Sequence, residues 1–141
     1  MKYVLDSNVA LKWVLAESDS ARAIRLRDEY SNGIHELQAP DIFPSEIANG
    51  LASAERQKRI QTGESAIFLN DILNVAPRLH SSLSLLIRAM EIAISTKQAV
   101  YDCIYLALAE AEQCELVTSD DQFARSLRSS FSFIITLGSL P

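Results

Sequence analysis

The chain has 141 residues, of which 48% are hydrophobic and 22% are charged, and its net charge at pH 7 is −5. This length fits one domain with a sizeable core, and the composition excludes a disordered chain. No apolar run approaches the roughly 18 residues of a membrane span, and the acid at position 6 comes too early for a secretory signal, so we expect a cytoplasmic protein without a membrane segment.

The N-terminal half predicts alternating strands and helices. The run KYVL ends abruptly at Asp6, which is typical of a short buried strand. A later helix begins at Pro44 and ends in RQKR, whose cations suit a helix C-terminus. In the helix after it, Ile67, Ile72 and Leu73 are expected on the buried side. The predicted strands of this half cover 2–5 and 35–39, and the predicted helices cover 9–15, 21–30, 44–59 and 62–76.

The C-terminal half continues this alternation. Its clearest helix covers 82–96, because five apolar residues recur there at helical spacing. They are Leu83, Leu86, Ile87, Met90 and Ile94. The other predicted elements are a strand at 78–81, a helix from Asp102, a strand at 116–118, a helix at 120–128 and a strand at 133–135. Short apolar strands separated by helices predict an α/β fold. We expect one domain over 1–141, with a parallel sheet of about five short strands covered by helices on both faces.

Four acids stand where strands end or helices begin. Asp6 ends the first strand, Glu46 lies in the first turn of the helix after the second strand, and Asp102 and Asp120 open the last two helices. The carboxyl ends of parallel strands form one edge of a sheet, and ligands bind in the crevice there. We therefore expect Asp6 and Asp120 at that edge, together with Glu46 if 35–39 is a strand.

Each of these acids has two explanations. Aspartate is a preferred N-cap and glutamate suits a first turn, and each such cap contributes about 1 kcal/mol. Two unit charges about 5 Å apart repel by about 3 kcal/mol at an effective dielectric constant of about 20, and by about 1 kcal/mol in bulk water. The repulsion of several such pairs would exceed the stabilisation that the caps contribute. A cluster of four acids therefore indicates a bound divalent cation. A capping carboxylate keeps its second oxygen free, so both roles can coexist.

The residue types favour Mg²⁺ or Mn²⁺ as this cation. All candidate ligands are hard carboxylate oxygens, and neither His35 nor His80 has a partner at zinc-ligand spacing. A bound cation would let an acidic chain meet phosphate groups, although nucleic-acid binders are more often basic. One of its water ligands could attack a phosphodiester. The four glycines form no phosphate-binding loop, which excludes a P-loop nucleotide hydrolase.

Four stretches of the chain resemble, in order, the motifs of PIN-domain ribonucleases, and especially the VapC-type toxins of toxin–antitoxin pairs. They are YVLDSNVALKWV, APDIFPSEIANGL, YDCIYLALAEA and LVTSDDQF. The resemblance extends from Lys2 to about Ile135. It implies a Mg²⁺- or Mn²⁺-dependent endoribonuclease that hydrolyses RNA. It also implies a cognate antitoxin as partner and a homodimer.

The resemblance assigns roles to individual residues. The acidic quartet that binds the metal and performs catalysis would be Asp6, Glu46, Asp102 and Asp120, with Asp6 and Asp102 as the first candidates for direct ligands. The residues lining the same pocket would be Asn8, Thr118 and Ser119. Asp121 departs from the pattern, and because the T-x-D spacing favours Asp120, we expect Asp121 to be a solvated first-turn residue. Tyr101 and Tyr105, one turn apart, are expected in the core rather than stacked on bases.

Three other interpretations compete with this one. A haloacid-dehalogenase-type phosphatase needs a second aspartate two residues after the first, and Asn8 stands there. A response-regulator receiver needs a lysine after a late strand, and no lysine follows Val117. The third alternative is a catalytically silent PIN-fold module for binding or assembly. The complete quartet argues against it.

Overall fold

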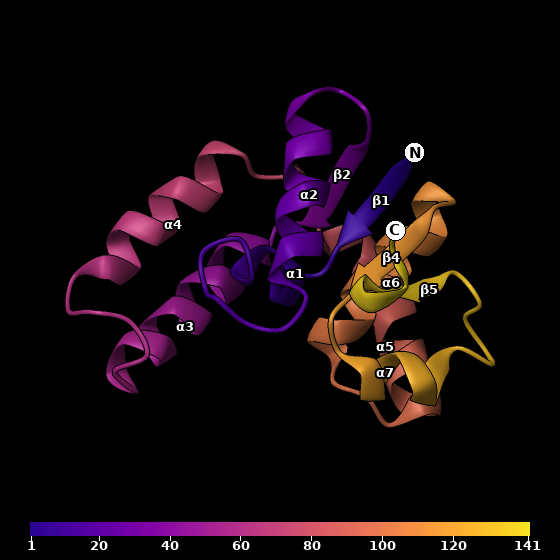
Figure 1. The fold of residues 1–141 in the computed structure, drawn as a ribbon. Helices are drawn as coiled ribbons and strands as arrows, with labels where there is room; N and C mark the ends of the chain where they lie inside the picture. The colour runs from indigo at the N-terminus through magenta and orange to yellow at the C-terminus, as the bar shows by residue number, and fades with distance from the viewer.

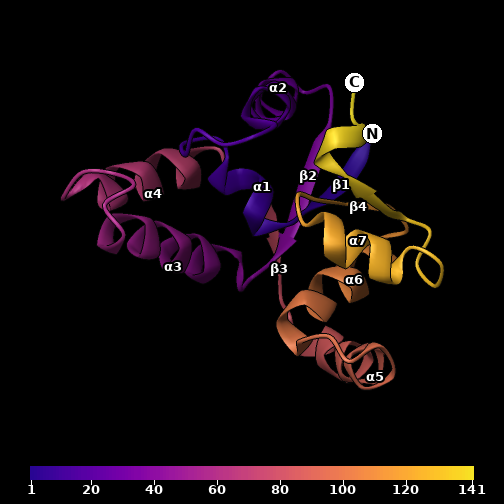
Figure 2. The same ribbon diagram turned by 60° about the horizontal axis from the view of Figure 1, so that its bottom comes forward.

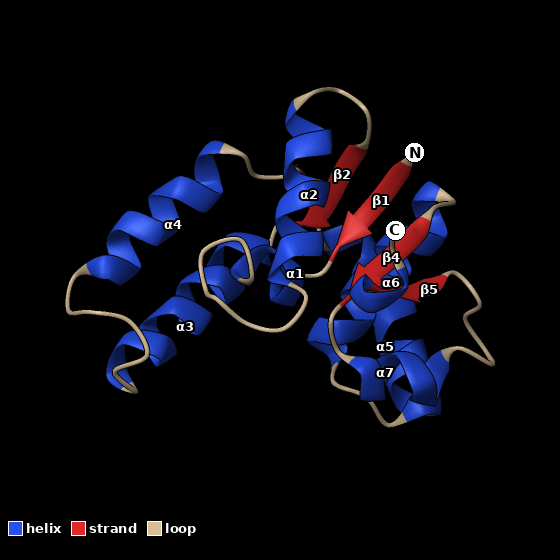
Figure 3. Ribbon diagram, viewed as in Figure 1, coloured by secondary structure: helices blue, strands red, loops and turns tan.

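The computed structural model describes residues 1–141 and contains one five-stranded sheet in the order β3-β2-β1-β4-β5. Every neighbouring pair of strands is parallel. The strands are β1 (Lys2–Leu5), β2 (Glu36–Pro40), β3 (Arg78–His80), β4 (Glu115–Thr118) and β5 (Ile134–Thr136). Figure 1 and Figure 3 show the shared direction of β1, β2 and β4. The predicted parallel sheet is confirmed, and each strand lies within one or two residues of its expected position.

Seven helices connect the strands. They are α1 (Ser7–Leu11), α2 (Ser20–Ser31), α3 (Phe43–Arg56), α4 (Glu64–Asn74), α5 (Leu86–Thr96), α6 (Val100–Glu112) and α7 (Asp121–Leu127), with short 3₁₀ turns at Leu83–Leu85 and Leu137–Ser139. Figure 2 shows α1 to α4 on one side of the sheet and α5 to α7 on the other. This division follows from right-handed crossovers, because the connections from β1 to β3 run toward one edge and those from β3 to β5 run back. The expected covering of both faces is confirmed.

Helix α6 lies at the centre of the core. It packs across β1, β2 and β4 on one side and against α5 on the other. Every residue from Cys103 to Ala109 is buried, as expected for a helix enclosed between two layers. The central strands are covered on both faces as well, since Val4, Leu5, Leu116 and Val117 have no exposed surface. The part of α6 that follows Asp102 is therefore packed between the sheet and α5.

The connections reverse direction between β1 and β4. These two strands pair directly, with Leu5 opposite Val117, and the N–H of Asp6 continues the ladder by donating to the Val117 carbonyl at 3.0 Å. From this point β1 leads into α1 on one face, while β4 leads toward α7 on the other. The chain thus diverges at the carboxyl ends of these strands, which is the arrangement that forms a ligand-binding crevice.

Two predicted helix boundaries are wrong in a way that affects the site. The first helix covers Ser7–Leu11 rather than 9–15, so it begins directly after Asp6. The penultimate helix begins at Val100, which places Asp102 in its first turn instead of at its start. The N-cap of that helix is Ala99.

Two apolar stripes face outward, and for the helix α4 the predicted burial is wrong at two of three positions. The five stripe residues of 82–96 are between 36% and 78% exposed, and the buried residues are Leu85, Ala89 and Ile92 instead. On α4, Ile72 is buried, but Ile67 and Leu73 are exposed. Both helices lie in an outer layer, where α5 packs mainly on α6 and α4 on α3. Each therefore buries one narrow side, and its other apolar side faces outward. None of the helices combines the length and apolar character needed to cross a lipid bilayer.

Candidate active site

The structure brings the four predicted acids together at the carboxyl edge of the sheet. Asp6 follows β1, Glu46 lies in the first turn of α3, Asp102 lies in the first turn of α6, and Asp120 precedes α7. Burial, together with the smaller effect of the negative charges of Asp102 and Glu46, raises the pKa of Asp6 to about 7, although hydrogen bonds oppose the rise. Acids almost a hundred residues apart in sequence therefore share one electrostatic environment.

The other carboxylates extend this cluster. Burial raises the pKa of Glu46, against the effect of its hydroxyl donors, and the charge of Asp102 adds to the rise. Burial also raises the pKa of Asp102, with a further contribution from the charge of Asp120. Asp6 and Glu46 are half-buried, whereas Asp102 and Asp120 are exposed. The acids thus form a continuous group that runs from the floor of the site to its rim.

Helix capping explains only one of the four acids. Asp120 accepts a hydrogen bond from the Phe123 N–H at 3.0 Å and is a genuine N-cap. Asp6 occupies the N-cap position of α1, but its side chain makes no cap bond, and Asp102 caps nothing. The side chain of Glu46 accepts from side-chain hydroxyls instead of from the helix backbone. The capping explanation therefore leaves three carboxylates unexplained.

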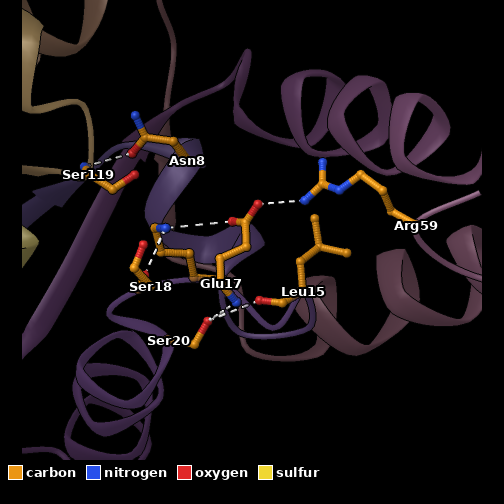
Figure 4. A network of polar contacts seen from close by, with 8 residues as sticks. Asn8, Leu15, Glu17, Ser18, Ser20, Arg59 and Ser119 are labelled. Carbon is orange, nitrogen blue, oxygen red and sulfur yellow. Dashed lines mark hydrogen bonds and ion pairs between the residues drawn. The ribbon is translucent and has the colours of Figure 1, made fainter. Parts of the chain in front are cut away.

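Two of the three predicted pocket-lining residues, Thr118 and Asn8, hold Asp6 in place, and the third, Ser119, holds Asn8. Asp6 Oδ2 accepts from the Thr118 hydroxyl at 3.0 Å and from the Asn8 amide at 3.2 Å. Thr118 Oγ1 in turn accepts from the Asp120 N–H at 3.1 Å, which links the first acid to the last. The Ser119 N–H donates to Asn8 Oδ1 at 3.0 Å, a bond visible in Figure 4. This network spans the β1–β4 crevice and fixes the orientation of the carboxylate.

Two residues of the site were missed by sequence analysis. The Tyr105 hydroxyl donates to Glu46 Oε1 at 2.7 Å, and Ser7 Oγ donates to the same oxygen at 3.3 Å. Tyr105 is buried as predicted, but a buried tyrosine hydroxyl needs a hydrogen-bond partner. The sequence could have indicated this role, because Tyr105 follows Asp102 by three residues and residues three apart share one side of a helix. Nothing in the sequence marked Ser7.

The acidic cluster has no internal cation. None of the ten ion pairs of the structure includes any of the four carboxylates. The neighbouring loop shows the contrast, since Glu17 pairs there with Arg59 at 2.6 Å (Figure 4). Asp121 is exposed in the first turn of α7, as expected.

The donor set fits a hard divalent cation. It consists of carboxylate oxygens around the half-buried Asp6, with no histidine or cysteine taking part. In this conformation no three such side chains already surround a single point at ligand distances. A metal would therefore require the exposed side chains of Asp102 and Asp120 to adjust. The ligand roles stay a prediction.

Hollows flank the acids on two sides. One, of about 530 Å³, shares Glu46 with the site and is bounded by Tyr101. The other, of about 250 Å³, lies between Asp102 and Asp120. Tyr101 is 66% exposed, so its predicted place in the core is wrong. Because α6 enters the core only from Cys103 onward, a side chain two residues earlier remains at the surface.

The comparisons with known proteins agree on one family. The family model described as "PIN domain" matches residues 3–126. Ribonuclease VapC3 of Pyrobaculum aerophilum is 29% identical over 126 residues, which cover 88% of this chain and 93% of the relative. Ribonuclease VapC9 of Mycobacterium tuberculosis is 29% identical over 117 residues, with 83% and 84% covered.

Solved structures show the same fold. The protein PAE2754 from Pyrobaculum aerophilum superposes with a TM-score of 0.72 at 19% identity, over 99% of this chain and 85% of that one. VapBC2 from Rickettsia felis, bound to a DNA fragment from their promoter, gives a TM-score of 0.62 at 15% identity, over 96% and 97% of the chains. A toxin–antitoxin complex from Klebsiella pneumoniae gives a TM-score of 0.59 at 14% identity, also over 96% and 97%.

Proposed function

The chain belongs to the PIN domain family, and from this premise we propose that it is a Mg²⁺- or Mn²⁺-dependent endoribonuclease and the toxin of a toxin–antitoxin pair. One observation carries the proposal: four carboxylates converge at the switch point of the sheet, where capping accounts only for Asp120 and no internal cation pairs with any of them. The similarity to proteins named VapC ribonucleases supports RNA as the substrate.

The chain's own residues would prepare the site for hydrolysis. Thr118 and Asn8 hold one oxygen of Asp6, while Tyr105 and Ser7 hold one oxygen of Glu46. In each carboxylate the second oxygen makes no protein hydrogen bond and is available as a ligand. Asp102 and Asp120 complete the set from the rim.

A bound Mg²⁺ or Mn²⁺ would neutralise the phosphate and supply an activated water. Hydrolysis at a site held by these four carboxylates would form one P–O bond from water to the phosphorus. It would break the bond to the 3′ oxygen of the preceding nucleotide, which would take up the proton that the water loses. The expected products carry a 5′-phosphate and a 3′-hydroxyl.

We also propose a cognate antitoxin that blocks this site. The Rickettsia felis and Klebsiella pneumoniae structures are described as a VapBC protein bound to promoter DNA and a toxin–antitoxin complex, which supports a protein partner here. An arginine of the antitoxin would suit the acidic pocket, because its planar fork pairs with carboxylates through two parallel hydrogen bonds. The exposed apolar stripe of α5 supports the proposed homodimer.

The test is cleavage of mixed RNAs by the purified protein with Mg²⁺ or Mn²⁺, with EDTA, and with the Asp102→Asn variant. Cleavage should require the metal and fall to background in the variant. The metal-free variant should be as stable as the wild type or more stable, by no more than about 1 kcal/mol, because one repelling charge is removed. Its metal-induced rise in melting temperature should shrink, because stabilisation by a ligand follows its affinity.

Asp121→Asn is the matched control, because it removes the same charge from an exposed position beside Asp120. This control should keep both activity and the metal-induced stabilisation. Cleavage that survives EDTA would refute the metal-dependent mechanism. Full activity and stabilisation in Asp102→Asn would refute the site. A wild-type protein that binds metal and RNA without cleaving would favour the silent module instead.

A further inference from the structure

The hollow beside Glu46 adjoins the acidic site through this one residue. It has a volume of about 530 Å³ and opens between α1, α3 and the first turn of α6. Glu46 belongs to both places, since its Oε1 is held by Tyr105 and Ser7 while its side chain forms part of the wall of the hollow. A nucleotide whose phosphate lies at the acids therefore has this hollow as its immediate neighbour.

The walls of the hollow suit a flat, uncharged group. Tyr101, which directly precedes Asp102, lines the hollow and is 66% exposed. Leu11 and Ile42 contribute an apolar floor. Gly50 keeps this floor in place, because a Cβ there would lie 2.6 Å from Leu11 Cδ1 and would displace that side chain. None of the lining residues is a lysine or arginine, so the hollow offers no counter-charge to a phosphate.

The rim of the hollow offers hydrogen bonds. Ser45 and Asn49 lie one turn apart on α3, are both exposed, and make no side-chain hydrogen bond within the protein. A primary amide presents a donor and an acceptor side by side, which matches the edge of a nucleobase. Proteins that bind single-stranded nucleic acid combine aromatic faces with hydrogen-bonding groups of this kind.

We propose that this hollow binds the nucleobase next to the scissile phosphate, stacked on Tyr101 and read by Asn49, so that Asn49 determines sequence specificity. The proposal rests on the proposed ribonuclease function. A nucleobase is favoured over a protein segment because the hollow adjoins the acids and its free polar groups lie beside the ring. An exposed tyrosine at its mouth would gain burial when a base stacks on it.

The test compares cleavage maps on a randomised RNA pool in Mn²⁺ for the wild type, Asn49→Ala, Tyr101→Ala and Tyr101→Phe. The wild type should prefer particular bases at one position next to the cut. Asn49→Ala should flatten that preference while metal-dependent cleavage persists. Tyr101→Ala should raise KM about tenfold, in line with the loss of one stacked base. Tyr101→Phe should stay within about twofold of the wild type because it keeps the aromatic face.

Asn70→Ala is the matched control, since Asn70 is an exposed asparagine on the neighbouring helix α4. Melting temperatures establish that every variant is folded. If the wild type cleaves and the maps and KM values of the Asn49 and Tyr101 variants equal those of Asn70→Ala, the hollow does not bind a base and the proposal fails. The same result is expected if the hollow receives a protein segment or a second copy. If the wild type itself does not cleave, it is the proposed function that fails.

Discussion

Asp120 combines two roles that the sequence presents as alternatives. One of its oxygens caps α7 through the Phe123 N–H, and the other makes no hydrogen bond within the protein. Asparagine caps helices about as well as aspartate, whereas replacing a cap by alanine costs about 1 kcal/mol. Substitution at this residue can therefore separate the structural role from the chemical one.

We predict that Asp120→Asn and Asp120→Ala both lose most RNA cleavage, because each removes a candidate ligand. Only Asp120→Ala should also lose stability, by about 1 kcal/mol in chemical denaturation of the metal-free protein. Equal stability of the two variants would mean that the cap contributes nothing. Full activity of Asp120→Asn would remove this residue from the metal site.

Asp6 makes the metal-free protein sensitive to pH. Its pKa is raised from 3.8 to about 7 in the folded protein, so the folded state holds a proton that the unfolded state releases. The stability that this proton contributes is fully present below pH 3.8 and is lost as the pH rises through about 7. Over that window the loss amounts to at most about 4 kcal/mol.

In EDTA, the free energy of unfolding of the wild type relative to Asp6→Asn should therefore fall between pH 4 and pH 7. The amide of the variant is neutral throughout and its oxygen can still accept from Thr118, which makes it the matched reference. Denaturant titrations at several pH values measure the difference. A difference that is independent of pH would contradict the raised pKa.

At the scale of the elements, α5 behaves unlike an ordinary surface helix. One side packs on α6, and the opposite side exposes an apolar stripe at helical spacing. Exposed apolar surface of this extent marks interaction sites in soluble proteins. The stripe is therefore the candidate interface of the expected homodimer.

We predict that Ile87→Glu, which places a charge in a stripe position that is 76% exposed, converts a dimer into a monomer without loss of fold. Burying that charge at an interface would be costly, whereas a monomer leaves it in water. Analytical ultracentrifugation of the wild type and the variant measures the mass. Ile67→Glu on α4 is the control, because it makes the same change at an exposed apolar position elsewhere and should remain dimeric. A dimeric Ile87→Glu would place the interface on another surface.

At the scale of the whole molecule, charge and architecture together constrain the activity. A chain with net charge −5 attracts RNA poorly by itself, so its affinity for phosphate should be concentrated where a cation binds. The divergence of the chain between β1 and β4 places the acids in that crevice. The site is thus a property of the sheet as a whole and of no single motif.

We predict that overproduction of the protein alone stops growth of its host and that Asp102→Asn does not, because the harm comes from RNA cleavage. Growth curves under induction, with equal protein levels confirmed by immunoblotting, measure this effect. Unimpaired growth with the wild type, together with active cleavage in vitro, would contradict the toxin assignment while leaving the ribonuclease intact.

The sequence by itself determined the parallel α/β fold and the positions of the acids. Apolar runs such as KYVL end at a polar residue, and this local change specifies where a strand stops. Once the strands are parallel, their carboxyl ends must share an edge, so Asp6 and Asp120 had to lie at the same edge. Only the structure shows that β1 and β4 are neighbours there. Glu46 followed once 35–39 formed a strand, whereas Asp102 joined the predicted site through the resemblance to PIN-domain ribonucleases. The inferences for Asp6, Asp120 and Glu46 needed only local patterns and the topology that they imply.

The tertiary structure alone decided which sides of the helices are covered. Tyr101 and Tyr105 are one turn apart, yet one is 66% exposed and the other 2% exposed. The stripe of 82–96 has the spacing of a buried side but faces outward. Helical periodicity identifies a side without stating what packs against it, because that depends on neighbouring layers formed by distant segments. For the same reason the hydrogen bonds from Tyr105 and Ser7 to Glu46, and the hollow beside it, emerge only when α1, α3 and α6 come together.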